Sequence, residues 1–456
     1  MKILVTGGTG FLGTPLIEEL LRRGHQVLLV TRKSSAEIEP NPCQIMSWPP
    51  RSEANEKAIL GCDAVINLAG ESLASGRWNN AKKQRIRNSR IQLTTDLVDI
   101  LRSSTKLHTF LSASAIGFYG DRKTEVLTES SHVGAGFLAE VCRDWEQAAL
   151  ALKRENLRTV LLRTGVVLGR NGGIIGELEP LFKMHVGGPV GYGEQHLSWI
   201  HIQDWVRAVL FCLENPSVTG AVNLVSPEPV TNASFSSVLS ELMRKPMQLP
   251  APAIALKLSL GEMSALALDS QNVRPEKLLQ NNFKFLFSYL REALKDIYDY
   301  EAQNHEIYEY FESSAWLPRS PDEVFRFFSD ARNLQKITPP EMGFVVEKMS
   351  TSEIVQGSLI DYKLKVHGIP IQWRTEIIQW APPKAFVDNQ LKGPYSRWHH
   401  THTFEPLAGG TLMKDRVHYK LPLGCIGRLF GLALVKKDVR HIFSYREKII
   451  REIFFL

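Results

Sequence analysis

The chain has 456 residues, of which 44% are hydrophobic and 22% charged, and its formal net charge is +6. This composition excludes a disordered or fibrous protein, and the length predicts two or three domains. The positive charge is small and dispersed, which gives no reason to expect a nucleic-acid partner. A nucleotide cofactor would satisfy the weak preference for an anion.

The five cysteines form no Cys-x-x-Cys pair, which favours free thiols in a reducing compartment over a disulfide framework. A strand-like run begins at the first residues and leaves no room for a signal peptide. The longest apolar stretch, 421–435, contains Arg428 and is shorter than the about 20 residues needed to span a bilayer. We therefore expect a cytoplasmic protein without a transmembrane segment.

The first 30 residues predict a strand, a glycine turn, a helix and a second strand. The apolar residues 3–5 are typical of a strand buried on both faces, and Gly7, Gly10 and Gly13 follow it. In this context the glycines allow a tight turn, close approach of a pyrophosphate and close helix–sheet packing. N–H groups at the helix N-terminus would hold the anion. We predict a dinucleotide site here; the alternative is that the glycines only shape a turn.

Further strands and amphipathic helices alternate along the first half of the chain. The expected strands are 63–68, 109–113 and 159–163, and the expected helices are 79–101 and 138–155. This alternation predicts a parallel, doubly wound sheet with right-handed crossovers. Residues 165–229 are glycine-rich and loop-like, which suits a substrate lobe, and 231–244 has the pattern of a capped helix. The mostly helical segment 250–300 is expected to pack back on the first domain.

A different pattern begins at about residue 304. Apolar residues at helical spacing follow Pro321, strand-like runs come next, and a long helix at about 426–453 closes the chain. The strand-like runs are 344–348, 358–366, 371–380, 386–391, 398–405 and 411–419. Helices, an antiparallel meander and a final helix predict a separate α+β domain. The expected division of the chain is 1–245, 246–303 and 304–456.

Six motifs in the first 300 residues point to one superfamily. They are 6–13 (TGGTGFLG), 67–71 (NLAGE), 112–120 (SASAIGFYG), 136–146 (GFLAEVCRDWE), 162–169 (LRTGVVLG) and 198–204 (SWIHIQD). With them the chain resembles the extended short-chain dehydrogenases/reductases, in their atypical nucleotide-sugar-epimerase-like branch, also described as cell-division-inhibitor-like. Residues 250–297, with Gly261-Glu-Met and Val273-Arg-Pro, resemble the small helical C-terminal segment of this branch.

The last third of the chain resembles helix-grip domains of the START and polyketide-cyclase type, whose curved sheet wraps a long helix around an apolar cavity. Together the two resemblances imply an α/β fold: a Rossmann-type doubly wound parallel sheet with a small helical extension, followed by a C-terminal α+β helix-grip domain.

The residues after the second strand decide between NAD and NADP. An acid there would bind the adenosine ribose hydroxyl and repel a 2′-phosphate, whereas a guanidinium would pair with that phosphate. The chain has Thr31, Arg32 and Lys33, and no acid before Glu37. This favours NADP as the cofactor; the alternative is that Arg32 and Lys33 belong to a solvated loop.

The resemblance places further residues against the cofactor. They are Thr9, Phe11 and Leu12 in the glycine turn, Leu68, Ala69, Gly70 and Glu71 after the next strand, Arg77 on the same loop, and Arg163 and Thr164 at a strand end.

The usual catalytic residues of the superfamily are only partly present. The resemblance implies a Ser at a strand end and a Tyr-x-x-x-Lys pair on a helix, with the Lys lowering the pKa of the Tyr. Ser114 stands at the Ser position, but Phe137 and Val141 replace Tyr and Lys and cannot exchange a proton. Tyr119 and Lys123 match the Tyr-x-x-x-Lys motif by spacing, but they lie in an expected loop. Outside a helix, residues i and i+4 need not lie on the same face. Ser114 and Tyr119 remain the catalytic candidates.

Histidines suggest two further sites. His201 could act as an acid or base near neutral pH, although a structural role is the stronger interpretation. His400 and His402 project from one strand face, but no third ligand follows at zinc spacing and such pairs are common on exposed strands. We therefore expect no metal site. The aromatic residues of the last third either line an apolar cavity or form an ordinary core, and both interpretations stay open.

Two functions remain. The first is an NADP-dependent, epimerase/dehydratase-like oxidoreductase of unknown small-molecule substrate, with an apolar-ligand-binding C-terminal domain. The second is a catalytically silent NADP(H)-binding regulator that controls a partner through that domain, with a link to cell division suggested by the resemblance alone. The missing Tyr–Lys pair favours the second. The substrate, the ligand of the C-terminal domain and the oligomeric state are left open.

Overall fold

The structure is a computed structural model that describes residues 1–33, 41–50, 52–170, 172–246 and 250–455. The chain divides into two compact units: the first ends at Glu306, and the main body of the second begins at Ile307. Among the described residues, no helix combines the length and the apolarity needed to cross a membrane.

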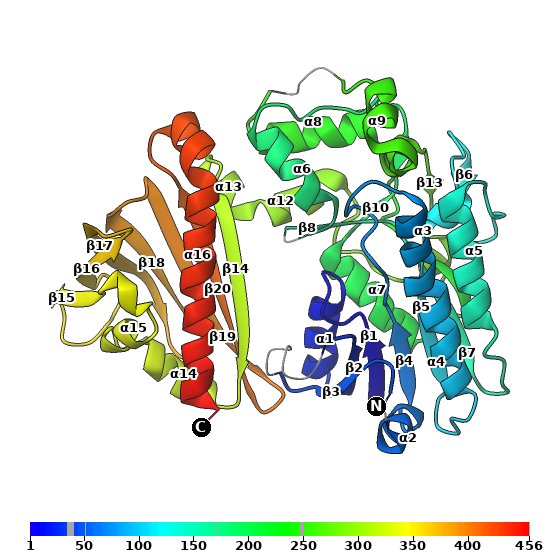
Figure 1. Cartoon of the computed structure of the whole chain (residues 1–456), viewed down its shortest axis with the longest axis horizontal. Helices are drawn as coiled ribbons and strands as arrows, with labels where there is room; N and C mark the ends of the chain where they lie inside the picture. The colour runs from blue at the N-terminus through cyan, green and yellow to red at the C-terminus, as the bar shows by residue number, and fades with distance from the viewer. Residues whose placement is uncertain (34–40, 51, 171, 247–249, 456) are drawn as a thin grey trace. The chain divides into compact units, whose positions relative to one another are not determined.

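A seven-stranded sheet forms the centre of the first unit (Figure 1). Its strands lie in the order β11-β7-β5-β4-β1-β2-β3, and each neighbouring pair is parallel. The bounds are β1 (Lys2–Thr6), β2 (Gln26–Thr31), β3 (Gln44–Ser47), β4 (Ala64–Asn67), β5 (Thr109–Ala115), β7 (Arg158–Thr164) and β11 (Gly220–Leu224). From β1 the chain adds β2 and β3 on one side. It then crosses to the other side of β1, where it adds β4, β5, β7 and β11. This order places the topological switch point between β1 and β4 and confirms the predicted doubly wound fold.

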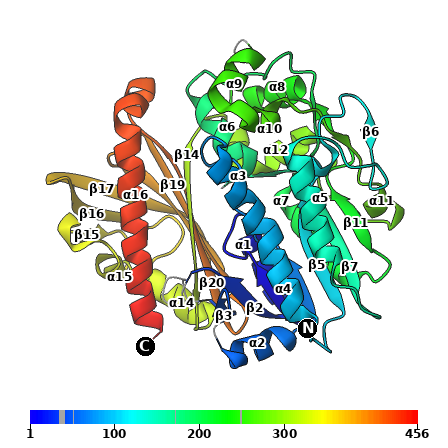
Figure 2. The ribbon, with the colours of Figure 1, turned by 45° about the vertical axis from the view of Figure 1, so that its right-hand side comes forward.

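Helices cover both faces of this sheet (Figure 2). On one face, α4 (Leu93–Leu101) and α5 (Phe137–Leu150) pack over a core that includes Leu4, Phe110 and Leu161. On the other face, α1 (Gly13–Arg22) packs against α7 (Ile202–Glu214). Because both faces are covered, successive residues of β1 are buried, which explains its continuous apolar sequence. The remaining helices before β5 are α2 (Glu53–Leu60), α3 (Asn80–Arg87) and a π-helical segment (Asn88–Gln92).

The loop-like interpretation of residues 165–229 was wrong for much of the segment. It contains α6 (Gly173–Lys183), α7 and β11, and the last two belong to the layers of the main domain. The glycines reflect close packing rather than loops: at Gly169 and Gly172, the ring of Phe11 lies within 3 Å of where a Cβ would stand. Two small sheets complete this region. They join β8 (Val166–Gly169) to β10 (Trp199–His201) and β9 (His196–Leu197) to β12 (Val230–Thr231).

The segment after α8 (Asn232–Leu242) packs back on the first domain, as predicted. Its strand β13 (Asn272–Val273) pairs in parallel with β6 (Val126–Leu127). The side chain of Gln271 donates hydrogen bonds to two carbonyl oxygens of the segment 116–120, at 3.1 and 3.2 Å. The helices of this segment are α9 (Ala253–Leu260), α10 (Ala265–Leu268), α11 (Glu276–Gln280), α12 (Leu290–Ile297) and α13 (Asp299–Asn304).

The second unit is a seven-stranded antiparallel sheet with a long helix, α16 (Gly424–Phe454), lying along it (Figure 1). Its strand order is β14-β20-β19-β18-β17-β16-β15. The bounds are β14 (Glu309–Leu317), β15 (Val345–Met349), β16 (Leu359–Val366), β17 (Ile369–Ala381), β18 (Ala385–Lys392), β19 (Arg397–Leu407) and β20 (Gly410–Lys420). Val439 and Phe443 of α16 pack on Val417 and Tyr419 of β20. Short helices α14 (Pro321–Phe328) and α15 (Arg332–Lys336) close one end, and the predicted helix-grip architecture is confirmed.

Candidate functional site

A cavity of ≈ 940 Å³ opens where five strands of the parallel sheet end, the fifth being β7 with Thr164. Thr6 at the end of β1, Thr31 at the end of β2, Leu68 directly after β4 and Ala115 at the end of β5 all line it. The cavity therefore lies at the topological switch point, which is where open α/β sheets bind their ligands.

The glycine turn after β1 leaves no room for side chains. Gly7 has a φ of 69°, and a Cβ there would lie 2.8 Å from the carbonyl group of Leu68. A Cβ on Gly13 would lie 2.4 Å from the carbonyl oxygen of Gly7. Helix α1 has no side-chain N-cap and no acidic residue in its first turn, so its N-terminus can receive an anion. These residues fit the pyrophosphate of a dinucleotide.

A buried polar network fixes the strand ends beneath this turn. Thr6 Oγ1 donates to Asn67 Oδ1 at 2.6 Å and accepts from the backbone N–H groups of Leu68 and Ala69 at 3.1 and 3.2 Å. Asn67 Nδ2 in turn donates to Thr94 Oγ1 on α4 at 2.8 Å. The network holds the loop after β4 in one position against the glycine turn. Residue types alone did not reveal it, because Thr and Asn at strand ends are common.

The two basic residues after β2 stand where a 2′-phosphate would be recognised. Arg32 and Lys33 are exposed and line the rim of the cavity, near Trp48. Neither forms an ion pair with another residue that the structure describes. Glu37, the first acid after them, lies outside the described residues.

Arg90 lines the cavity although no sequence pattern singled it out. It comes from the π-helical segment, a distortion that often marks functional sites. Arg90 Nη2 donates to the carbonyl oxygen of Glu71 at 3.0 Å, and its guanidinium lies against Gly70 and 5.4 Å from the Trp145 ring centroid. Burial lowers the pKa of this guanidinium. The Glu71 carboxylate is paired with Lys82 at 2.7 Å, a bond that lowers the pKa of Glu71.

Ser114 lies in the cavity wall and belongs to a buried charged network. Its Oγ donates to Glu146 Oε1 at 2.7 Å, and Arg163 forms a two-pronged ion pair with the same carboxylate, with both bonds at 2.8 Å. Arg163 also donates to the Tyr119 hydroxyl at 3.0 Å, which itself donates to Asn223 Oδ1 at 2.7 Å. Desolvation raises the pKa of Tyr119, which is fully buried. The hydroxyl of Tyr119 is thus already engaged inside the protein.

Tyr119 and Lys123 do not form a helical pair. Tyr119 ends a 3₁₀ turn (Ile116–Tyr119), whereas Lys123 has a φ of 54°, is 79% exposed and pairs with Asp121. At the position of the family's Lys stands Val141, which lines the cavity beside Cys142. This part of the cavity wall is therefore apolar. Burial raises the pKa of the Cys142 thiol to about 12, so this wall offers no ready proton donor.

The structure brings most of the predicted site residues to this one cavity. Those in its lining are Gly7, Thr9, Gly10, Phe11, Leu12, Gly13, Thr31, Arg32, Lys33, Leu68, Ala69, Gly70, Glu71, Ser114 and Thr164. Arg77, Tyr119 and Arg163 are not part of the lining: Arg77 lies against Gly261, and the other two belong to the network behind Ser114.

His201 is buried and has structural partners. Its Nδ1 accepts the N–H of Gln203 at the start of α7, and its Nε2 lies 3.3 Å from Asp296. Its ring lies 4.1 Å from that of Phe287. These contacts agree with the structural interpretation of this residue.

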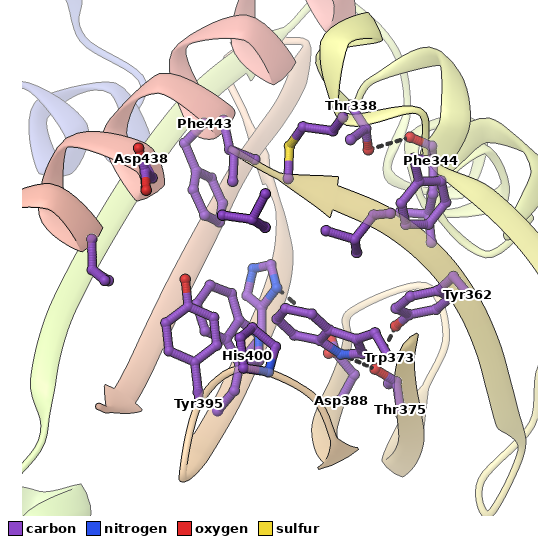
Figure 3. Close-up of a pocket in the computed structure, with 18 of the residues that line it drawn as sticks. Thr338, Phe344, Tyr362, Trp373, Thr375, Asp388, Tyr395, His400, Asp438 and Phe443 are labelled. Atoms are coloured by element: carbon purple, nitrogen blue, oxygen red, sulfur yellow. Dashed lines mark hydrogen bonds and ion pairs between the residues drawn. The ribbon is translucent and has the colours of Figure 1, made fainter. Parts of the chain in front are cut away.

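The second unit contains a cavity of ≈ 520 Å³ lined mainly by apolar and aromatic side chains (Figure 3). Trp373, Tyr395 and Phe443 surround it, and His400 and Asp388 lie deep among them. The expectation that His400 and His402 stand on an exposed strand was wrong: they are 4% and 3% exposed. The inner face of β19 is covered by the rest of the unit, which single-strand alternation could not show.

Three family models match successive parts of the chain. They are the NAD dependent epimerase/dehydratase family at residues 3–224, a domain of unknown function (DUF1731) at 251–297, and polyketide cyclase / dehydrase and lipid transport at 317–441. The relatives below match only about the first two thirds of the chain.

Two curated relatives and two solved structures illustrate the similarity. The chain is 37% identical over 302 residues to the chloroplastic epimerase family protein SDR39U1 homolog of Arabidopsis thaliana, covering 65% of this chain and 86% of that protein. It is 35% identical over 299 residues to epimerase family protein YfhF of Bacillus subtilis, covering 65% and 98%. It is also similar to human SDR39U1 crystallised with NADPH (31% identity, TM-score 0.59, covering 66% and 99%). The nucleoside-diphosphate sugar epimerase of Corynebacterium glutamicum is similar as well (33% identity, TM-score 0.54, covering 66% and 58%).

The relatives match about the first two thirds of this chain at identities above 30% and over most of their own length. The chain therefore belongs to the NAD dependent epimerase/dehydratase family, within the short-chain dehydrogenases/reductases, and carries a polyketide-cyclase- and START-like domain after it.

Proposed function

We propose that the first unit binds NADP(H) and acts as an epimerase/dehydratase-like oxidoreductase on a small molecule. The observation that carries the proposal is the switch-point cavity, which combines a glycine turn too tight for side chains with two cations at the end of β2. The solved structure of the human relative with NADPH supports the choice of cofactor.

Each part of the cavity has a role in holding the cofactor. The N-terminus of α1, with Gly10 and Gly13, would hold the pyrophosphate, and Arg32 and Lys33 would pair with the 2′-phosphate. Leu68 and Ala69, fixed by Thr6, would contact the cofactor from the end of β4. When bound, NADP(H) supplies hydride transfer.

Ser114 is the residue that we assign to the reacting end of the site. Its own proton is directed to Glu146, so its oxygen can accept a hydrogen bond from a substrate hydroxyl. A proton given to Ser114 can then pass to the Glu146 carboxylate, while Arg163 holds that carboxylate in place. This relay would serve the purpose for which other family members use a Tyr–Lys pair.

The second candidate is an NADP(H)-binding regulator without turnover, with a link to cell division suggested only by resemblance. One observation favours it: the wall that should carry the proton-exchanging pair contains Val141 and Cys142. In either case we propose that the second unit binds an apolar ligand, because its cavity is lined mainly by apolar side chains. We also propose a cytoplasmic location, supported by the free thiols of the four cysteines whose side chains are described.

Cofactor titrations with the full chain test the binding proposal. NADPH should bind more tightly than NADH. The variant Arg32→Ala should lose about tenfold in NADPH affinity and little in NADH affinity, because one charged hydrogen bond of about 1.5 kcal/mol disappears. Arg102→Ala, which removes an exposed cation outside the cavity lining, is the matched control and should change neither affinity. Equal binding of the two cofactors, or tighter NADH, would contradict the assignment.

Turnover separates the two candidates. Bound NADPH that is oxidised, or NADP that is reduced, by metabolites of a cell extract supports the enzyme, and Ser114→Ala should then slow this reaction without loss of cofactor affinity. Tight cofactor binding with no turnover supports the regulator.

A further inference from the structure

Three side chains from two neighbouring strands meet at the floor of the cavity in the second unit. Asp388 on β18 pairs in register with His400 on β19, and His402 lies two residues further along β19, on the same face. Their exposed fractions are 15%, 6% and 4% of the side chain. Figure 3 shows His400 between the aromatic rings of Tyr395 and Trp373, and Asp388 below Trp373.

The polar atoms of these three side chains converge. Asp388 Oδ2 lies 3.1 Å from His402 Nε2 and 3.6 Å from His400 Nδ1. One ligand atom from each residue lies within 4.8 Å of the others. In a tetrahedral zinc site with bonds of about 2.0–2.1 Å, ligand atoms are about 3.3 Å apart. The two distances from Asp388 are close to this spacing, and the two imidazole nitrogens lie within 4.8 Å of each other.

A second carboxylate lies behind both imidazole rings. Asp415 on β20 pairs in register with His402, and its Oδ1 is 2.9 Å from His400 Nε2 and 2.8 Å from His402 Nδ1. These are the nitrogens on the far side of each ring from Asp388. In metal sites such a carboxylate fixes the tautomer and the orientation of a ligating histidine. Asp415 has this position for both rings at once.

The charge of the cluster favours a cation. Asp388 and Asp415 are buried carboxylates, and the guanidinium of Arg446, 3.8 Å from Asp415, is the basic group beside them. Asp438, the other acidic residue of the described lining, pairs with His367 Nε2 at 2.9 Å and does not belong to the cluster. Buried carboxylates in apolar surroundings require pairing or a metal ion. When both histidines are neutral, as metal ligands are, the two carboxylates and the one guanidinium leave one net negative charge, which favours a cation.

We propose that Asp388, His400 and His402 bind one divalent transition-metal ion, of the zinc type, and that Asp415 orients the two histidines. Two imidazoles and one carboxylate form a ligand set used in metal sites that keep an open position. That position faces the apolar cavity, so an apolar ligand that carries an oxygen donor can reach the ion. The third ligand comes from β18 and precedes both histidines in the chain, so the residues that follow His402 do not contain it.

Metal titration of the full-length, chelator-treated chain tests the proposal. Co²⁺ should bind at one equivalent with the intense visible absorption of a low-coordinate nitrogen and oxygen site, and Zn²⁺ should displace it. Asp388→Asn and His400→Ala should each abolish this absorption. Asp415→Asn should keep it and weaken the affinity about 10–100-fold, the cost typical of an outer-shell partner. His399→Ala is the matched control, because His399 lies on the opposite face of β19 beside Asn389 and should leave binding unchanged.

Circular dichroism and thermal unfolding without metal establish which variants are folded. A folded Asp388→Asn variant that binds Co²⁺ as tightly as the wild type would overturn the assignment. If no variant folds, the wild type still decides the question: one tight equivalent of Co²⁺ with a higher unfolding temperature supports the site. The absence of stoichiometric Co²⁺ and Zn²⁺ binding overturns it.

Discussion

Replacing Gly13 with alanine tests whether close contact between helix α1 and the glycine turn builds the cofactor site. The new methyl carbon would lie 2.4 Å from both the carbonyl oxygen of Gly7 and the Cα of Gly8. Because nonbonded heavy atoms prefer separations of about 3.5 Å, α1 has to move by about 1 Å. Backbone atoms surround the site, so no flexible side chain can absorb this shift.

The displacement affects stability and binding together. Overpacking of this kind costs about 1–3 kcal/mol of unfolding free energy. The N–H groups at the start of α1 move with the helix, and each lost hydrogen bond to a phosphate costs about 1.5–3 kcal/mol. The dissociation constant for NADPH should therefore rise at least about tenfold.

NADPH fluorescence titration and thermal unfolding measure the two effects. Gly176→Ala is the control, because Gly176 lies in α6 and, apart from its chain neighbours and the backbone of its own helix, no atom lies within 4 Å of its Cβ position. That change should leave NADPH affinity unaltered and stabilise the protein by about 0.5–1 kcal/mol. If Gly13→Ala binds NADPH like the wild type and unfolds at the same temperature, the packing account of this turn is wrong.

Three further predictions concern the buried groups behind the cavity. Tyr119→Phe should cost about 1–2 kcal/mol by leaving buried partners unsatisfied, while any turnover persists; loss of turnover with intact NADPH binding would instead make Tyr119 catalytic. Arg163→Met leaves the Glu146 carboxylate buried and unpaired, and denaturant unfolding should show a loss of about 3–5 kcal/mol, whereas a loss below about 1 kcal/mol would contradict the pairing. The carboxylate of Glu129 accepts the backbone N–H groups of Asn223 and Lys277 at 3.0 and 3.2 Å, and burial raises its pKa in the folded protein. Its contribution to stability is therefore full below the unfolded pKa of about 4.3 and is lost as pH rises through the folded pKa. Glu129→Gln should remove this fall from the pH profile of unfolding, and an identical profile would refute it.

Local patterns predicted much of the fold. The continuous apolar run of β1 indicated a strand buried on both faces, and the spacing of Val324, Phe325 and Phe328 indicated a helix that the structure bounds at Pro321–Phe328. The segment 165–229 could not be predicted in this way. Its glycines make room for the ring of Phe11, a contact across the sequence that has no local signature.

The parts of the candidate sites that depend on short sequence motifs could be predicted. The parts that depend on how strands pair in register could not. The glycine turn and Arg32 are read from adjacent residues, and the structure places them in one cavity. Arg90 resembles any polar residue of an amphipathic helix until the π-helical segment turns it toward that cavity. The partner of His400 and His402 is Asp388, and only the pairing of β18 with β19 brings it beside them.

The pairing of β13 with β6 affects the order in which the protein becomes able to hold its cofactor during synthesis. The glycine turn leaves the ribosome first, because translation proceeds from the N-terminus. Asp269 and Gln271, which complete the cavity wall, emerge only after more than half of the chain has been made. The cofactor cavity is therefore closed only once β13 has reached β6, when α11, α12 and α13 of the first unit and the whole second unit still follow in the chain.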